Sequence, residues 1–159
     1  MKKKLILISL VIILILVSSL ILFRPKGLNS KQDFVKRVLQ IAVVSGEIPD
    51  YDLIKDNRNI ILSSENLDTK LIPMLDGIKF AILSPAEIKE KANKEGDFLY
   101  LKFNKIDIGG KNASISLDNT WSVSDTSKVG YLSGGGFTIT FHKFMGSWVE
   151  DKLRQSWIS

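Results

Sequence analysis

The chain has 159 residues, among them a single histidine, His142, and no cysteine. One imidazole can act as a general base, but it cannot supply a site of two or three histidines, and no thiolate is available as nucleophile or zinc ligand. Alternation along two predicted strands places His142 and Asp118 on an outer sheet face, where they could pair if the strands are neighbours. The alternative is a surface pair of little consequence, so we assign no catalytic residue.

A second residue with functional potential is Asn119, which alternation places on the apolar face of its predicted strand. A buried amide needs hydrogen-bond partners. We predict that Asn119 lines a ligand pocket; a local bulge or an internally bonded core asparagine is the alternative. The predicted ligand-binding residues are Asn119, Trp121, Tyr100 and Trp148.

Two further motifs lack the partners that their chemistry requires. Asp50, Asp52 and Asp56 partly resemble a calcium loop, but the glycine and the terminal glutamate are missing at the required offsets. Consecutive glycine amides at 134–136 can cradle an anion, yet neither GK[ST] nor a helix follows them. We therefore expect a hairpin loop or a glycine bulge there, and we predict no metal site and no cofactor.

The amino-terminal part of the chain is a run of 19 uncharged residues from Leu5 to Phe23, interrupted only by three serines. As a helix this run spans roughly 28 Å, close to the hydrocarbon thickness of a bilayer. We predict that residues 1–26 form a transmembrane signal-anchor and that residues 27–159 form one domain. A cleaved secretory signal is the alternative, although the run exceeds the usual length of such signals.

The distribution of charge orients the predicted anchor and excludes one class of partner. Three lysines precede the apolar run and two basic residues follow it, which favours a cytoplasmic amino terminus. We therefore expect a single-pass cell-membrane protein whose domain is periplasmic or extracellular, or a secreted protein after cleavage. Of the 22 basic residues, five precede Gly27, which leaves 17 basic against 17 acidic residues in the domain. This neutral balance gives no basis for nucleic-acid binding.

The first half of the domain has strong helix signals. Ser30 and Asp33 can cap an amphipathic helix over 31–44, and a further short helix is expected within 47–58. Strands are predicted at 59–63 and 77–83. Ser84, Pro85 and Glu87 then form a capping-box sequence for a helix that ends near Lys94.

After Gly96 the hydrophobic period changes to two, which predicts strands at 97–107, 112–123, 137–142 and 148–158. Short turns between successive strands favour an antiparallel meander. The fold class is therefore α+β: an N-terminal transmembrane helix, then a curved antiparallel sheet packed on two or three helices.

The last predicted hairpin has an aromatic strand, a glycine turn and a tryptophan at Phe141, Gly146 and Trp148. With the order of elements, this resembles the nuclear-transport-factor-like cone fold, also described as SnoaL-type or cystatin-like. The resemblance implies coverage of most of 30–159 and a family that includes isomerases, dehydratases, assembly modules and membrane-anchored domains. Its catalytic members place an Asp-His pair or an acidic base inside the cone, whereas the parity of His142 directs it away from the core.

The function that we predict is a membrane-anchored, non-enzymatic binding or assembly module on the non-cytoplasmic side. Its partners would be the membrane, through the N-terminal helix, and an unknown protein or a second copy of the chain. The alternative is a small enzyme or ligand carrier that uses the interior of the cone. A filled interior would count against this alternative.

Overall fold

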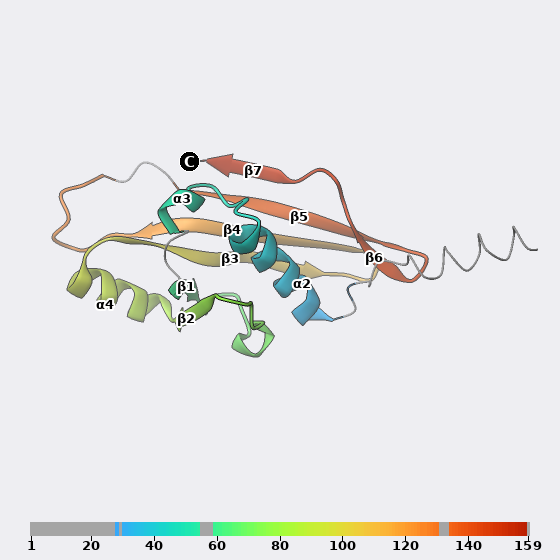
Figure 1. Ribbon diagram of the computed structural model, residues 1–159, viewed down its shortest axis with the longest axis horizontal. Coiled ribbons are helices and arrows are strands. Elements are labelled where there is room, and N and C mark those ends of the chain that lie inside the picture. Colours follow the sequence, from blue (N-terminus) through green and yellow to red (C-terminus); the bar gives the residue numbers. More distant parts are fainter. Residues whose placement is uncertain (1–27, 29, 55–58, 131–133, 159) are drawn as a thin grey trace, which may run out of the picture.

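The computed structural model describes residue 28 and residues 30–54, 59–130 and 134–158, which form an α+β domain with a strongly curled mixed sheet (Figure 1). The predicted transmembrane segment and most of the linker after it lie outside the described residues. Among the helices that the structure does describe, none has the length and apolar character needed to cross a membrane.

The first helix of the domain is α2, Lys31–Leu39, which continues as the π-helix η1, Gln40–Val44. The predicted cap is present: the Asp33 amide donates to Ser30 Oγ at 3.2 Å, and the Ser30 amide donates to Asp33 Oδ2 at 2.9 Å. Together the two elements cover the predicted range of 31–44. The short helix predicted within 47–58 is α3, Tyr51–Ile54.

The strands form one sheet in the order β2-β1-β3-β4-β5-β6, and β7 pairs with the same edge of β5 as β6. Strands β3 to β6 form the predicted antiparallel meander. The strand bounds are β1 Asn59–Ser63, β2 Lys79–Leu83, β3 Phe98–Ile108, β4 Asn112–Ser122, β5 Gly135–Phe144, β6 Ser147–Glu150 and β7 Gln155–Ile158.

The prediction of a wholly antiparallel sheet is wrong, because β1 lies parallel to both β2 and β3. The connection from β1 to β2 includes the 3₁₀ helix η2, Thr69–Leu71, which packs near α2, so β2 returns in the same direction as β1. Parallel strands are usually covered on both faces and are apolar without alternation. The sequence of β1 fits this rule, since its last four residues are all buried.

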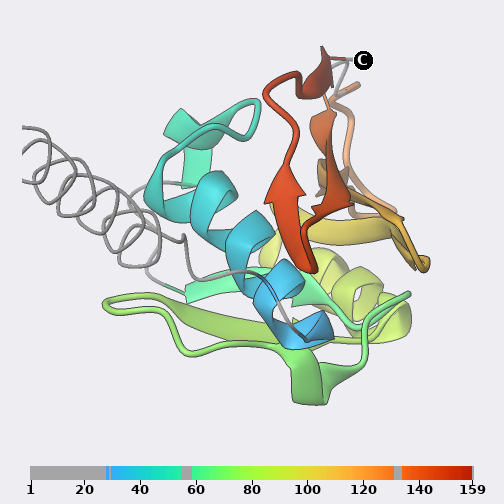
Figure 2. The same ribbon diagram turned by 90° about the vertical axis from the view of Figure 1, so that its right-hand side faces the viewer.

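Helices cover both faces of the sheet. The concave face encloses α2 and η1, as Figure 2 shows. Helix α4, Pro85–Glu95, begins with the predicted capping box and packs on the opposite face. There Ser122 Oγ donates to the Ile88 carbonyl at 3.3 Å. Alternation along β4 places Ser122 on the face opposite to Leu117, which belongs to the main core. Ile88 and Ala92 are buried outside that main core, so α4 closes a smaller second layer.

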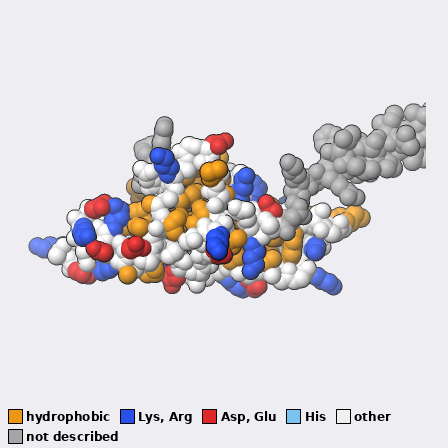
Figure 3. All heavy atoms as spheres, turned by 90° about the horizontal axis from the view of Figure 1, so that it is seen from below, with side chains coloured by type: hydrophobic (Ala, Val, Ile, Leu, Met, Phe, Trp, Pro, Cys, Tyr) orange, Lys and Arg blue, Asp and Glu red, His pale blue; other side chains and the backbone are white. Residues whose placement is uncertain are grey.

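The main core fills the space between the sheet and the first helix. Side chains from α2 and η1 meet alternate residues of β3, β4 and β5. On the surface, the face seen from below carries charges of both signs around a group of hydrophobic side chains (Figure 3). The largest fully buried side chains are Phe34, Phe103, Phe141, Leu39, Ile41, Leu62, Leu101, Ile115, Leu117 and Ile139.

The final strand predicted at 148–158 is divided into β6 and β7. His142 pairs with Val149, and Thr138 pairs with Gln155. Between these two pairs the edge segment has two more residues than β5 has. An arginine-glutamate network holds this edge against α2: Glu150 accepts from Arg37 Nε at 2.7 Å and from Arg154 at 2.7 Å, and Arg154 also pairs with Glu47.

Candidate functional site

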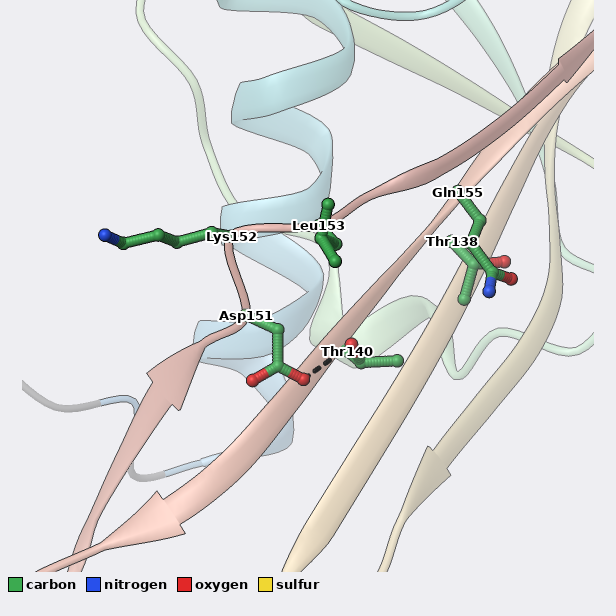
Figure 4. A pocket seen from close by; sticks show the side chains of 6 residues that line it. All are labelled: Thr138, Thr140, Asp151, Lys152, Leu153 and Gln155. Carbon is green, nitrogen blue, oxygen red and sulfur yellow. Dashed lines mark hydrogen bonds between the residues drawn. The ribbon is translucent and has the colours of Figure 1, made fainter.

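A hollow in the surface lies where the edge strand leaves β5. The Asp151 amide still donates to the Thr140 carbonyl at 2.9 Å, but the chain then leaves the ladder until Gln155. This excursion opens a hollow of about 380 Å³ on the outer face of the sheet (Figure 4). Its lining residues are Thr138, Thr140, Asp151, Lys152, Leu153 and Gln155.

A second hollow of about 340 Å³ adjoins the first and shares Thr140 and Asp151 with it. It adds polar side chains from the start of β4 and the end of β3, namely Asp107, Asn112 and Ser114. We call the two hollows together the outer groove. Because α2 lies on the concave side, the outer groove occupies a part of the sheet that this helix does not cover.

Asp151 is the centre of the polar contacts in the outer groove. Thr140 Oγ1 donates to its Oδ2 at 2.7 Å, as Figure 4 shows, and His142 Nδ1 lies 2.5 Å from its Oδ1. The hydrogen bonds from Thr140 and His142 lower the pKa of Asp151 from its ordinary 3.8. The carboxylate is therefore ionised near neutral pH and fixes the orientation of both neighbours.

The hydrogen bonds among Thr140, Asp151 and His142 decide what chemistry these side chains support. Activation of a hydroxyl as a nucleophile needs a general base whose pKa lies near the working pH, but the Thr140 hydroxyl donates to Asp151, whose lowered pKa makes it a weak base. The second hydroxyl, on Thr138, already shares a hydrogen bond of 2.6 Å with Ser116 Oγ. The outer groove thus offers a preorganised polar surface suited to binding, without an activated hydroxyl.

The pair predicted between Asp118 and His142 is not formed. Asp118 lies opposite Gly136 in the β4–β5 ladder, whereas His142 lies opposite Asn112, six residues away along each strand. Asp118 instead accepts a hydrogen bond from Asn104 at the bulge in β3. Burial raises the pKa of Asp118, while Asn104 and Lys102 oppose this effect. His142 is exposed, in agreement with its predicted outward direction.

The four predicted ligand-binding residues are spread over the sheet. Asn119 is 0% exposed on the concave face, and its Nδ2 donates to the Pro49 carbonyl at 2.8 Å, which matches the internally bonded alternative. Trp121 follows on the same face by alternation, while Tyr100 points to the opposite face. Trp148 lies opposite Lys143, eight residues along β5 from the partner of Asn119. The structure therefore does not bring Trp148 beside Asn119, and ligand binding by these residues stays a prediction.

Sequence reasoning missed Thr140 and Asp151 as parts of a site. The outward parity of Thr140 is visible in the alternation of β5, but Asp151 acquires its place only from the register of the edge strand. Within the described ranges, no three His, Asp or Glu side chains are grouped so that they could hold a metal ion.

Comparisons with known proteins identify no relative: no family model matches the chain, and neither a curated protein nor a solved structure matches it. The class that can be stated is therefore an α+β domain with a curled mixed sheet.

The contacts of Asp151 predict a specific titration. The folded-state pKa of Asp151 is lower than its unfolded-state pKa. Its hydrogen bonds therefore stabilise the fold fully at pH values above the unfolded-state pKa, and this stabilisation is lost as the pH falls through the folded-state pKa. We expect carboxyl NMR resonances of Asp151 to titrate below 3.8, and Thr140→Val to move the midpoint upward because one donor is lost. An unchanged midpoint in Thr140→Val would contradict this assignment. Thr120→Val, on the outer face of β4, is the matched control.

Proposed function

We propose that this protein is a membrane-anchored, non-enzymatic binding or assembly module whose domain is displayed on the non-cytoplasmic side. The anchor is the apolar run from Leu5 to Phe23, and the lysines before it favour a cytoplasmic amino terminus. The domain is then periplasmic or extracellular; cleavage of the run would instead give a secreted protein.

The observation that carries the binding function is the outer groove itself. It is open and it presents hydroxyl, amide and carboxylate groups whose positions are fixed by the sheet. Leu153 stands at its edge and is 86% exposed, so an apolar side chain is available beside the polar groups. An apolar side chain next to preorganised polar groups is the combination that protein interfaces use.

The filled concave face favours binding over catalysis. In a cone-shaped enzyme the substrate enters this face, but here α2 and η1 fill it with side chains such as Phe34, Val38 and Ile41, none more than 1% exposed. The likeness to the nuclear-transport-factor-like cone stays a prediction, and the structure shares with it an α+β domain with a curled sheet. The parallel pairing of β1 with β2 departs from the antiparallel sheet that we expected from that likeness.

A second candidate function is a small enzyme or a ligand carrier that uses the interior. One observation favours it: Asn119 Oδ1 is buried, and no hydrogen-bond partner is found for it among the described residues. A buried carbonyl oxygen without a partner is costly, and a polar ligand group could satisfy it.

Co-purification tests the binding function. The full chain is extracted from membranes of its own cells in mild detergent, and its molar mass is measured by light scattering during size exclusion. We expect a homo-oligomer or a complex with a defined partner, and we expect Leu153→Asp to disrupt it because Leu153 borders the outer groove. The matched control is Leu53→Asp, an exposed leucine on α3. A strictly monomeric chain, or equal loss in both variants, would contradict the proposal.

A further inference from the structure

The turn between β5 and β6 presents two apolar side chains to solvent. Phe144 is 57% exposed and Met145 is 85% exposed. They stand at the end of the sheet that projects to the right in Figure 1, and Figure 3 shows hydrophobic side chains at the extremity of that same end. Folding of the domain gains little from either side chain, and adjacent exposed apolar side chains at one tip are a candidate contact surface.

The backbone of this turn makes the methionine more informative. Met145 and Gly146 are the two central residues of the hairpin loop, with φ of 47° and 82°. Two-residue loops with positive φ at both positions strongly favour Asn-Gly or Asp-Gly. A bulky apolar residue is disfavoured in the left-handed region, so local structure does not account for Met145.

Lysines lie close to this apolar tip. Lys143 is next to Phe144, and its Nζ lies 5.7 Å from the centre of the Trp148 ring. The turn between β3 and β4 reaches the same end, because the Lys143 amide donates to the Lys111 carbonyl at 2.8 Å. Both lysines are exposed. The nearby acidic group Asp107 has a lysine of its own, Lys105, at 3.2 Å.

The chain enters the domain beside the same hairpin. Leu28 forms an isolated antiparallel bridge with Trp148 on β6. Only four residues separate Leu28 from Phe23, the last residue of the apolar run, so the end of the run lies within about 18 Å of Leu28. Trp148 pairs with Lys143, and Met145 follows Lys143 by two residues. Met145 therefore lies about 7 Å from Lys143 along the strand.

We infer that the β5–β6 tip, formed by Phe144 and Met145 with Lys143 and Lys111 beside them, inserts into the interface of an anionic lipid bilayer. The inference rests on the proposed anchor, which brings a bilayer within reach of the tip. Exposed aromatic and aliphatic side chains next to lysines are the combination that binds the headgroup region. The contact gives the anchored domain a second attachment and so restricts its orientation.

The absence of cysteine from the chain allows a direct test. The full-length Ser147→Cys variant carries one environment-sensitive fluorophore beside the tip and leaves both apolar residues intact. It is reconstituted into vesicles of phosphatidylcholine with phosphatidylglycerol, with or without nitroxide-labelled lipid. We expect the nitroxide to reduce the emission at least about twofold, since interfacial segments lie about 5 to 10 Å deep. The same label at Ile158→Cys, which is exposed on β7 opposite Gly135, should not be quenched.

Two substitutions connect the quenching to the tip. Met145→Asn suits the backbone of the turn and should preserve the fold while removing most of the quenching at residue 147. Met74→Asn, at another exposed methionine, should leave the quenching unchanged. Lys143→Glu should weaken the contact about fivefold or more on anionic vesicles, with a much smaller effect on neutral ones.

The label at Leu14→Cys, within the apolar run, separates this inference from the proposed function. Quenching at residue 14 without quenching at residue 147 would overturn the tip contact and leave the anchor intact. No quenching at either position would overturn both. An emission shift at residue 147 that depends on protein concentration, without quenching by lipid, would show that a second copy covers the tip and would also overturn the inference.

Discussion

Replacement of Phe34 by alanine is expected to lower the free energy of unfolding by about 3 to 5 kcal/mol. Phe34 is 1% exposed, and its ring meets Phe141 at 4.9 Å and Trp148 at 5.4 Å, both edge to face. The substitution leaves a cavity between α2 and the sheet and also removes both ring contacts. Because small domains are stabilised by only about 5 to 15 kcal/mol in total, this is a large share.

Urea unfolding of the detergent-solubilised chain, followed by tryptophan fluorescence, measures this loss. The matched control is Phe144→Ala, at an exposed phenylalanine at the end of β5. For this variant we expect the free energy of unfolding to change by no more than about 0.5 kcal/mol. Equal losses for the two variants would contradict the buried packing of Phe34 against Phe141 and Trp148.

The second large effect is expected for Gly135→Ala. A Cβ atom at this position would lie 2.6 Å from Pro49 Cβ and 2.7 Å from the Trp157 carbonyl oxygen. Neither is the end of a flexible side chain, so β5, β7 and the segment around Pro49 must move apart. We expect a loss of about 1 to 3 kcal/mol, as for other overpacked sites. The displacement also strains the hydrogen bond from Asn119 to Pro49.

Gly110→Ala is the matched control for this substitution. It lies in the turn between β3 and β4, where a Cβ atom would meet nothing within 4 Å. We expect its unfolding free energy to stay the same or to rise by about 0.4 to 1 kcal/mol. If Gly135→Ala were as stable as Gly110→Ala in the same urea titration, the close approach at Pro49 would be refuted.

Local signals predicted the elements of this fold well. Ser30 with Asp33 and Ser84 with Glu87 act through hydrogen bonds within three residues, so the sequence alone is sufficient to place both helix starts. The alternation in β4 likewise identified its buried face, and His142 lies outward as its parity indicated.

Long-range pairing accounts for the errors. The direction of β2 depends on how η2 packs near α2, which no local pattern encodes. The partner of His142 depends on strand register: with β5 opposite β4 in the observed register, Asp118 is remote, and the edge strand supplies Asp151 instead. The candidate site was missed because it also depends on strand register: Asp151 reaches Thr140 although the two residues are eleven positions apart in the sequence.

The interruption between β6 and β7 also bears on how the protein behaves when crowded. A long, regular edge strand is a template on which other chains add and grow into amyloid. Here the edge of β5 is covered by two four-residue strands, and the chain between them carries Lys152 and Arg154. Neighbouring molecules therefore meet a short, charged and irregular border, which disfavours fibril growth from this side of the sheet.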